Sequence, residues 1–144
     1  VEVHVFTRGA DARQFARQLG AVEAKGAYDL ADVPLDSSII FAPVGDIVLP
    51  ALESLIPGGT LAMAGIHMTD VPKLNYQKHL FHEKTLTSVE SNTRRDGEEF
   101  LTLADRLDIH PEVHEYALDQ AAEALKYVKA GDIKGACVLR VSED

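Results

Sequence analysis

The chain has 144 residues with no tryptophan and a single cysteine, Cys137, and aromatic residues make up only 6% of it. One cysteine excludes an internal disulfide and a structural zinc site built from several cysteines, which is typical of a protein in a reducing compartment. No apolar run approaches the roughly 18 residues of a membrane-spanning helix. No charged-then-apolar leader precedes the first predicted strand. We therefore expect a cytoplasmic protein with no membrane partner.

Basic residues are also scarce. The chain has 14 Lys and Arg against 23 Asp and Glu, so its formal net charge is −9. Proteins that bind nucleic acid present a basic surface to the phosphate backbone, so this balance argues against a nucleic-acid partner. Hydrophobic residues at 46% and charged residues at 26% are ordinary for a globular protein and leave little room for disorder. A chain of this size buries a substantial core, so we expect one domain over residues 1–144.

Strand patterns alternate with helix patterns along the chain. We predict strands over residues 1–6, 21–23, 38–41, 60–64, 85–89, 113–117 and 136–141, with helices that begin near Asp11, Asp46, Asp96 and Asp119. Asp11, Asp46 and Asp119 can each cap the helix that follows, and Gly131 is expected to end the last helix. In the helix near Asp96, the side chains expected to face inward are Phe100, Leu101, Ala104 and Leu107. The segment Pro57-Gly58-Gly59 is expected to end the second helix. The apolar run at 38–41 predicts a strand that is covered on both faces.

This alternation predicts an α/β fold with a doubly wound parallel sheet. In that architecture ligands bind beyond the carboxyl ends of the strands. Four turns are expected to line one such crevice: Thr7-Arg8, residues 42–45, residues 65–67 and residues 91–94.

Several short segments, in this order, resemble the cofactor-binding half of the medium-chain, zinc-type alcohol dehydrogenases. They are Thr7-Arg8, Leu19-Gly20-Ala21, residues 36–45, 57–60, 64–68, 88–97, 121–125 and 131–135. The resemblance implies a Rossmann-like nucleotide-binding domain fragment over residues 1–144, in which residues from about 113 to 144 include the C-terminal return segment. It also implies an oxidoreductase that moves a hydride between nicotinamide and a small alcohol or carbonyl.

In that family, the matching stretch follows a first Rossmann strand, a Gly-rich turn and an N-terminal domain that holds the catalytic zinc. None of these is found in the 144 residues. We therefore expect an incomplete sheet that lacks the first strand and the Gly-rich turn. Zinc is expected in the parent enzyme and not on this chain, and we predict no catalytic and no metal-binding residues here. The isolated chain is expected to be inactive.

A missing central strand would leave unpaired backbone groups on both of its neighbours, and such edges invite pairing with another strand. We expect one of three outcomes. Residues 1–6 move into the vacant centre, they exchange with a second copy of the chain, or another chain fills the gap. A homo-oligomer, such as a dimer, is therefore predicted.

Thr7 and Arg8 end the first predicted strand. NAD enzymes place an acidic residue there against the ribose 2′-hydroxyl, whereas NADP enzymes place hydroxyl and basic groups around the 2′-phosphate. The Arg8 guanidinium can bond a phosphate with two parallel N–H groups. We therefore favour NADP as the cofactor, with NAD still possible. The alternative is a solvated arginine at a strand end.

The resemblance implies further contacts with the cofactor. They involve Ala42, Pro43 and Val44 near the riboses, Gly65, Ile66, Asn92 and Thr93 near the nicotinamide, Arg94 near a phosphate or a substrate group, and Lys134 near the pyrophosphate. For the turn at 42–45, for Arg94 and for Lys134, the alternative is an ordinary turn or a surface side chain.

A second class of function is a non-enzymatic α/β interaction module. Its partner surface would be the apolar loop 66–81, which carries Met68, Leu74, Tyr76 and Phe81. The same side chains could instead cover the sheet or contact a domain outside this chain.

Overall fold

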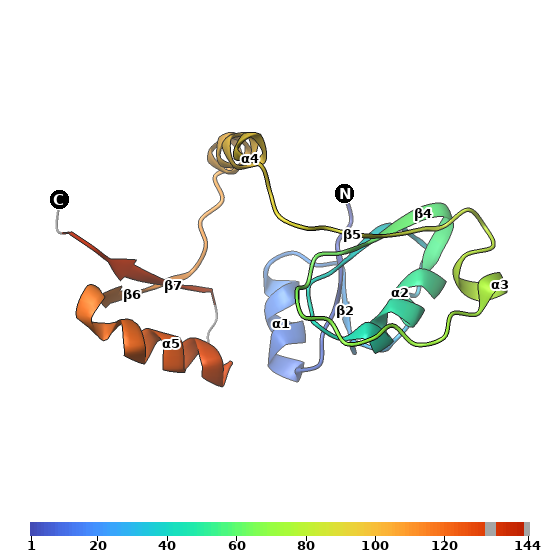
Figure 1. Cartoon of the computed structure of the whole chain (residues 1–144), viewed down its shortest axis with the longest axis horizontal. Coiled ribbons are helices and arrows are strands. Elements are labelled where there is room, and N and C mark those ends of the chain that lie inside the picture. The colour runs from blue at the N-terminus through green and yellow to red at the C-terminus, as the bar shows by residue number, and fades with distance from the viewer. Residues whose placement is uncertain (132–134, 143–144) are drawn as a thin grey trace. The chain divides into compact units, whose positions relative to one another are not determined.

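The computed structural model describes residues 1–131 and 135–142, and it divides into two compact units, residues 1–91 and 92–144. The first unit contains β1 (His4–Phe6), α1 (Ala10–Gln18), β2 (Glu23–Lys25), β3 (Leu35–Ile40), α2 (Val48–Glu53), β4 (Leu55–Met63), α3 (Tyr76–His79) and β5 (Thr85–Ser88) (Figure 1). The second contains α4 (Arg94–Arg106), β6 (Val113–Ala117), α5 (Ala121–Ala130) and β7 (Ala136–Arg140). None of the helices described is long and apolar enough to cross a membrane.

All the strand pairs in the described part of the chain are parallel, which confirms the predicted α/β fold. They form three separate sheets, β1-β2, β3-β4-β5 and β6-β7. The helices α1 and α2 each connect two neighbouring parallel strands, as a βαβ unit requires. The predicted strands therefore exist, but they are distributed over three sheets.

The first strand pairs with β2, with His4 opposite Glu23 and Phe6 opposite Lys25. It is not hydrogen-bonded to β3. The prediction that residues 1–6 move into the vacant centre of the sheet is therefore wrong, because the short crossover through α1 places β1 beside β2. Exchange with a second copy, or insertion of another chain, stays a prediction.

The core of the first unit lies between α2 and the β3-β4-β5 sheet, and Figure 1 shows α2 beside β4. Val48, Leu52 and Leu61 are 0% exposed. On the strand before α2, however, Ile39 is 58% exposed and Phe41, just past the strand end, is 74% exposed. The prediction that both faces of this run are covered is therefore wrong, since successive strand residues point to opposite faces and α2 packs on only one.

The helix α2 ends at Glu53, and Pro57-Gly58-Gly59 lies inside β4. The pairing with β3 shifts there, because Leu35 faces Leu55 while Ser37 faces Thr60. Gly58 has a φ of 75°, and its N–H donates to the His82 carbonyl (2.8 Å). The predicted helix stop is thus a bulge within a strand, made possible by the left-handed backbone of glycine.

The sequence predicts aspartate caps at Asp11, Asp46 and Asp119, and these predictions are wrong. Asp11 lies in the first turn of α1, which begins at Ala10. The other two lie in single 3₁₀ turns, Gly45–Ile47 and Leu118–Gln120, that precede α2 and α5. Carboxylates at these places still interact favourably with the positive end of the helix dipole.

In the second unit, α4 begins after Thr93 and not at Asp96. The Thr93 hydroxyl accepts from the Asp96 N–H (3.2 Å), and an Asp96 carboxylate oxygen accepts from the Thr93 N–H (2.7 Å), so the two form a capping box. Of the four side chains predicted to face inward, Phe100, Leu101 and Leu107 are exposed and Ala104 is half-buried. The prediction is therefore wrong for the three larger side chains: α5 packs on β6 and β7, and no residue of α4 is buried.

Candidate functional site

The carboxyl ends of β3, β4 and β5 meet at one edge of the sheet. The N–H groups of Ala64 and Gly65, which follow β4, both donate to the Ile40 carbonyl at the end of β3 (2.8 and 3.1 Å). The Val89 N–H, which follows β5, donates to the Met63 carbonyl (2.9 Å). The turns predicted at 42–45 and 65–67 therefore lie side by side.

The Ala42-Pro43-Val44-Gly45 turn is held by a neighbouring segment of the chain. The buried Gly45 N–H donates to the Thr69 hydroxyl (2.8 Å). A Cβ at Gly45 would lie 2.1 Å from the Asp70 carbonyl oxygen. At Gly65, a Cβ would lie 2.8 Å from the Phe41 carbonyl oxygen. Both glycines are therefore required by close backbone approach within the chain.

Two residues just past this edge have a left-handed backbone although they are not glycine. His67 has a φ of 58° and Ser91 a φ of 74°. Backbone strain of this kind clusters at functional sites, because the surrounding structure must maintain it. The sequence predicts a turn at residues 91–94 but not the left-handed backbone of Ser91, since its side chain is compatible with many turn conformations.

The end of β1 carries the predicted site for the 2′-phosphate. The Thr7 N–H donates to the Lys25 carbonyl (3.0 Å), which continues the β1-β2 pairing by one residue. Nη1 of Arg13, from α1, donates to the carbonyl oxygens of both Thr7 (3.1 Å) and Arg8 (2.8 Å). The Arg8 side chain is exposed. Arg13 is the residue at this turn that sequence reasoning did not assign.

A second cluster of charges lies on β1 and β2. His4 Nδ1 lies 2.9 Å from Glu23, and the Lys25 ammonium bonds both Glu23 and Asp32. The hydrogen bond to Asp32 raises the pKa of Lys25, and the same bond lowers the pKa of Asp32. The positive charge of Lys25 is therefore already balanced by carboxylates.

Three of the predicted cofactor contacts lie in the described part of the second unit. Asn92 is exposed, and Arg94 is the exposed first residue of α4. The Thr93 side chain is engaged in the cap of that helix. Lys134 lies outside the described residues.

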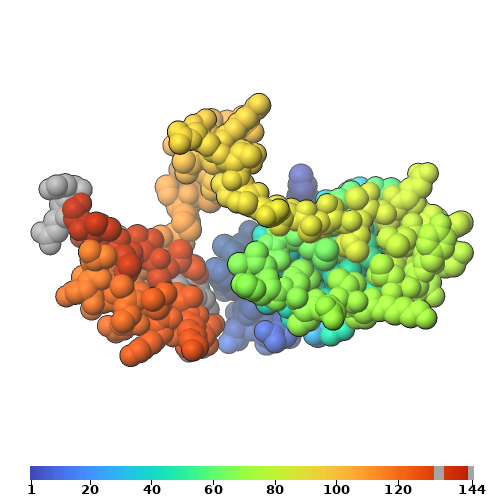
Figure 2. All heavy atoms as spheres, viewed as in Figure 1, coloured from blue at the N-terminus to red at the C-terminus, as the bar shows by residue number. Residues whose placement is uncertain are grey.

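In the loop between β4 and β5, some apolar side chains pack on the core and others are exposed. Met68 and Leu74 pack against the core of the first unit, whereas Ile66, Tyr76 and Phe81 are exposed. In Figure 2 the green residues of this segment form much of the visible surface of the unit. Part of the loop thus covers the sheet, and part remains available to a partner.

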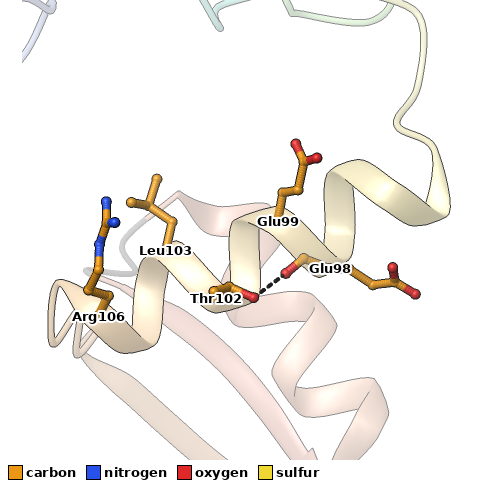
Figure 3. Close-up of a pocket in the computed structure, with 5 residues that line it drawn as sticks. All are labelled: Glu98, Glu99, Thr102, Leu103 and Arg106. Atoms are coloured by element: carbon orange, nitrogen blue, oxygen red, sulfur yellow. Dashed lines mark hydrogen bonds between the residues drawn. The ribbon is translucent and has the colours of Figure 1, made fainter.

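Two hollows occur among the described residues, one in each unit, and neither is lined by the turns predicted to bind the cofactor. One, of about 360 Å³, is lined by five side chains of α4 alone, and Figure 3 shows the Thr102 hydroxyl donating to the Glu98 carbonyl (2.8 Å). The other, of about 240 Å³, is lined by residues 30–34 and 53–55. It lies at the amino ends of β3 and β4, opposite the edge where the turns meet.

The donor groups present do not fit a zinc ion. Within residues 1–131 and 135–142, no three His, Cys, Asp or Glu side chains lie close enough to hold a metal. His79 is buried, and its Nδ1 accepts from the Asn75 N–H (2.9 Å), while His82 is exposed. Burial lowers the pKa of His79.

A family model described as zinc-binding dehydrogenase matches residues 9–139. The chain belongs to the zinc-binding dehydrogenase family. Among curated proteins, this zinc-binding dehydrogenase chain is 56% identical over 140 residues to the "Probable alcohol dehydrogenase AdhA" of Mycobacterium tuberculosis (strain CDC 1551 / Oshkosh). The match covers 97% of the chain and 40% of that relative. The chain thus spans less than half the length of the curated relative it matches.

Solved structures share the fold of this zinc-binding dehydrogenase chain. CAD from Helicobacter pylori, complexed with NADP(H), matches with a TM-score of 0.77 at 20% identity, over 96% of the chain and 40% of that protein. The Bacillus subtilis protein yhfP, with NAD bound, matches with a TM-score of 0.75 at 20% identity, over 97% of the chain and 47% of that protein. These likenesses confirm the Rossmann-like fold, and the separate sheets fit a fragment of it.

Proposed function

We propose that the chain is the nucleotide-binding part of an NADP-dependent alcohol dehydrogenase that moves a hydride between nicotinamide and a small alcohol or carbonyl. Membership of the zinc-binding dehydrogenase family supports the reaction class. When bound, the dinucleotide supplies or accepts the hydride. The chain itself would bind and orient the dinucleotide, and no catalytic residue is assigned to it.

The preference for NADP rests on one observation, the turn after β1. Arg8 stands where an NAD enzyme would place an acidic residue, and its exposed guanidinium has no hydrogen bond or ion pair with any residue that the structure describes. An acid there would repel a 2′-phosphate, whereas a free guanidinium bonds it with two N–H groups. We assign Thr7 and Arg8 to this phosphate.

The paired turns after β3 and β4 are the proposed contact with the rest of the dinucleotide. Ala42, Pro43 and Val44 would lie along the riboses, and Gly65 and Ile66 along the nicotinamide. The shared edge described above supports this assignment. Asn92, Thr93, Arg94 and Lys134 complete the proposed set, which is carried over from the family resemblance.

Calorimetry with the 144-residue chain tests the proposal. We expect NADPH to bind about tenfold or more tightly than NADH, since one charge-assisted pair contributes roughly 1.5–3 kcal/mol. Arg8→Gln should abolish this preference, and Arg95→Gln, on the exposed side of α4, should not alter it. Equal affinities for NADPH and NADH in the unaltered chain would contradict the NADP preference.

A second candidate function is an interaction module, which the exposure of Ile66, Tyr76 and Phe81 favours. Failure of both dinucleotides to bind would support it. We also propose a cytoplasmic location and a homo-oligomer, and light scattering of the purified chain tests the oligomer. The chain is expected to show no alcohol oxidation with either dinucleotide.

A further inference from the structure

Three arginines occupy the segment that runs from the end of β1 into α1. They are Arg8, Arg13 and Arg17. None of them forms an ion pair with a carboxylate in residues 1–131 and 135–142, although the chain has a net charge of −9. The nearby Lys25, by contrast, is paired with Glu23 and Asp32. Arg8 and Arg13 thus bring positive charge without an ion-pair partner among the described residues to the turn after β1, whereas Arg17 lies away from it.

Arg13 is bonded differently from the other two arginines. Its Nη1 donates to two carbonyl oxygens in succession, those of Thr7 (3.1 Å) and Arg8 (2.8 Å), so both protons of that nitrogen are engaged. The side chain is half-buried, whereas Arg8 and Arg17 are exposed. Arg17 bonds only the Ala24 carbonyl (2.6 Å), on β2.

These two bonds have two consequences for an anion at the turn. They cover the negative ends of the two carbonyl dipoles, which would otherwise repel a phosphate. They also fix the two peptide groups on either side of the Arg8 Cα, and so limit where the Arg8 side chain can begin. The remaining donors of Arg13, Nε and Nη2, make no hydrogen bond with the described residues.

We propose that Arg13 is a positioning residue for the 2′-phosphate. Its guanidinium holds the turn at Thr7 and Arg8 so that the Arg8 side chain can reach the phosphate, and it covers the two carbonyl oxygens that would otherwise repel the phosphate. This inference rests on the proposed NADP function. It adds a residue six positions beyond Thr7 to the determinants of specificity. Arg13 acts through the backbone of the turn, while Arg8 contacts the phosphate.

The test compares two small ligands, adenosine 2′,5′-bisphosphate and 5′-AMP, which differ by the 2′-phosphate. Neither carries the nicotinamide half, so the comparison does not depend on the turns after β3 and β4. Their dissociation constants are measured by calorimetry on the 144-residue chain and on Arg13→Gln, Arg13→Lys and Arg17→Gln. The ratio of the two constants is the readout, because a purely structural defect weakens both ligands alike.

The unaltered chain is expected to bind the bisphosphate at least tenfold more tightly than 5′-AMP. Arg13→Gln should lower this ratio about tenfold, and Arg17→Gln, which removes a similar bond away from the turn, should leave it unchanged. Arg13→Lys keeps the charge but not the rigid fork, and should lower the ratio about threefold. If Arg13→Gln does not fold, as judged by circular dichroism, Arg13→Lys decides the question.

A ratio that neither Arg13 variant lowers, or an equal loss of affinity for both ligands, would overturn the role of Arg13 and leave the NADP proposal intact. A chain that does not discriminate between the two ligands at all would overturn the NADP proposal, and the role of Arg13 with it.

Discussion

The first unit buries Val48, Leu52 and Leu61 completely, whereas in the described part of the second unit the most buried hydrophobic residue is the small Ala124. The difference follows from the number of strands. Three parallel strands under α2 create a space that large side chains fill, whereas, among the described residues, the two paired strands β6 and β7 with α5 bury only the small Ala124 completely enough to count as core. In the second unit, α4 relies on its cap and not on burial. The two units should therefore respond differently to equivalent changes.

The largest expected effect is the loss of a core leucine. Leu61→Ala should reduce the free energy of unfolding by about 2–5 kcal/mol, because it leaves a cavity between β4 and α2. Leu101→Ala, at a side chain that is 68% exposed on α4, should change it by about 0.5 kcal/mol or less. Urea denaturation followed by circular dichroism measures both. Similar losses in the two variants would remove the contrast between the units.

A pair of glycines gives a second contrast. Gly45→Ala should destabilise the first unit by about 1–3 kcal/mol, because the new methyl group meets the Asp70 carbonyl. Gly97→Ala, inside α4 with open space around it, should stabilise the helix by about 0.5–1 kcal/mol. Thermal melting of both variants tests the opposite signs. If Gly45→Ala left the melting temperature unchanged, residues 69–70 would not pack closely against the turn at 42–45.

A smaller effect is expected from the protonation of His79 in the first unit. Burial lowers the pKa of His79 below its ordinary value near 6.5. The negative charge of Glu53 raises this pKa, and the positive charges of Lys78 and Lys84 lower it further. The folded state thus binds the proton more weakly than the unfolded state. The contribution of neutral His79 to the free energy of unfolding is therefore fully present above pH 6.5 and decreases as the pH drops below that value. A proton on Nδ1 also removes the acceptor for the Asn75 N–H.

The urea midpoint at pH 7.5 and at pH 5.5 measures this effect. The decrease should be larger in the unaltered chain than in His79→Asn, and His82→Asn, at an exposed site, should behave as the unaltered chain. An equal decrease in all three would show that other groups account for the pH dependence.

The smallest effect concerns Asp96 in the second unit. Hydrogen bonds from the backbone and hydroxyl of Thr93 lower the pKa of Asp96 below 3.8. Its contribution to the stability of α4 is therefore present above about pH 3.8 and is lost as the pH falls through the lower, folded-state pKa. The protection of the amides in the first turn of α4, taken relative to the intrinsic exchange rate at the same pH, should fall below pH 3.8. Asp96→Asn should remove this dependence and Asp105→Asn should not.

Much of the fold could be predicted from local pattern. The alternation of strands and helices, the strands at β5 and β6, and the helix stop at Gly131, with its φ of 78°, depend on neighbouring residues and are confirmed. The predictions were wrong where segments far apart in the sequence determine the local structure. Pro57-Gly58-Gly59 became part of a strand because β3 and His82 offered backbone partners. No pattern along the chain indicates such partners.

The candidate site likewise has one residue that the sequence indicates and one that only the structure reveals. Arg8 stood out in the sequence because its charge and its place after a strand are both local facts, whereas Arg13 is six residues beyond Thr7 and resembles any surface arginine of a helix. Only the packing of α1 beside β1 brings its guanidinium to two carbonyl oxygens.

The order of the residues by itself determined the α/β class, the family and the basic turn after β1, because periodicity, composition and short motifs are properties of neighbours. The tertiary structure decided which strands pair, which faces are buried and which arginine supports the turn. These outcomes depend on backbone groups that are far apart along the chain and meet only when it folds.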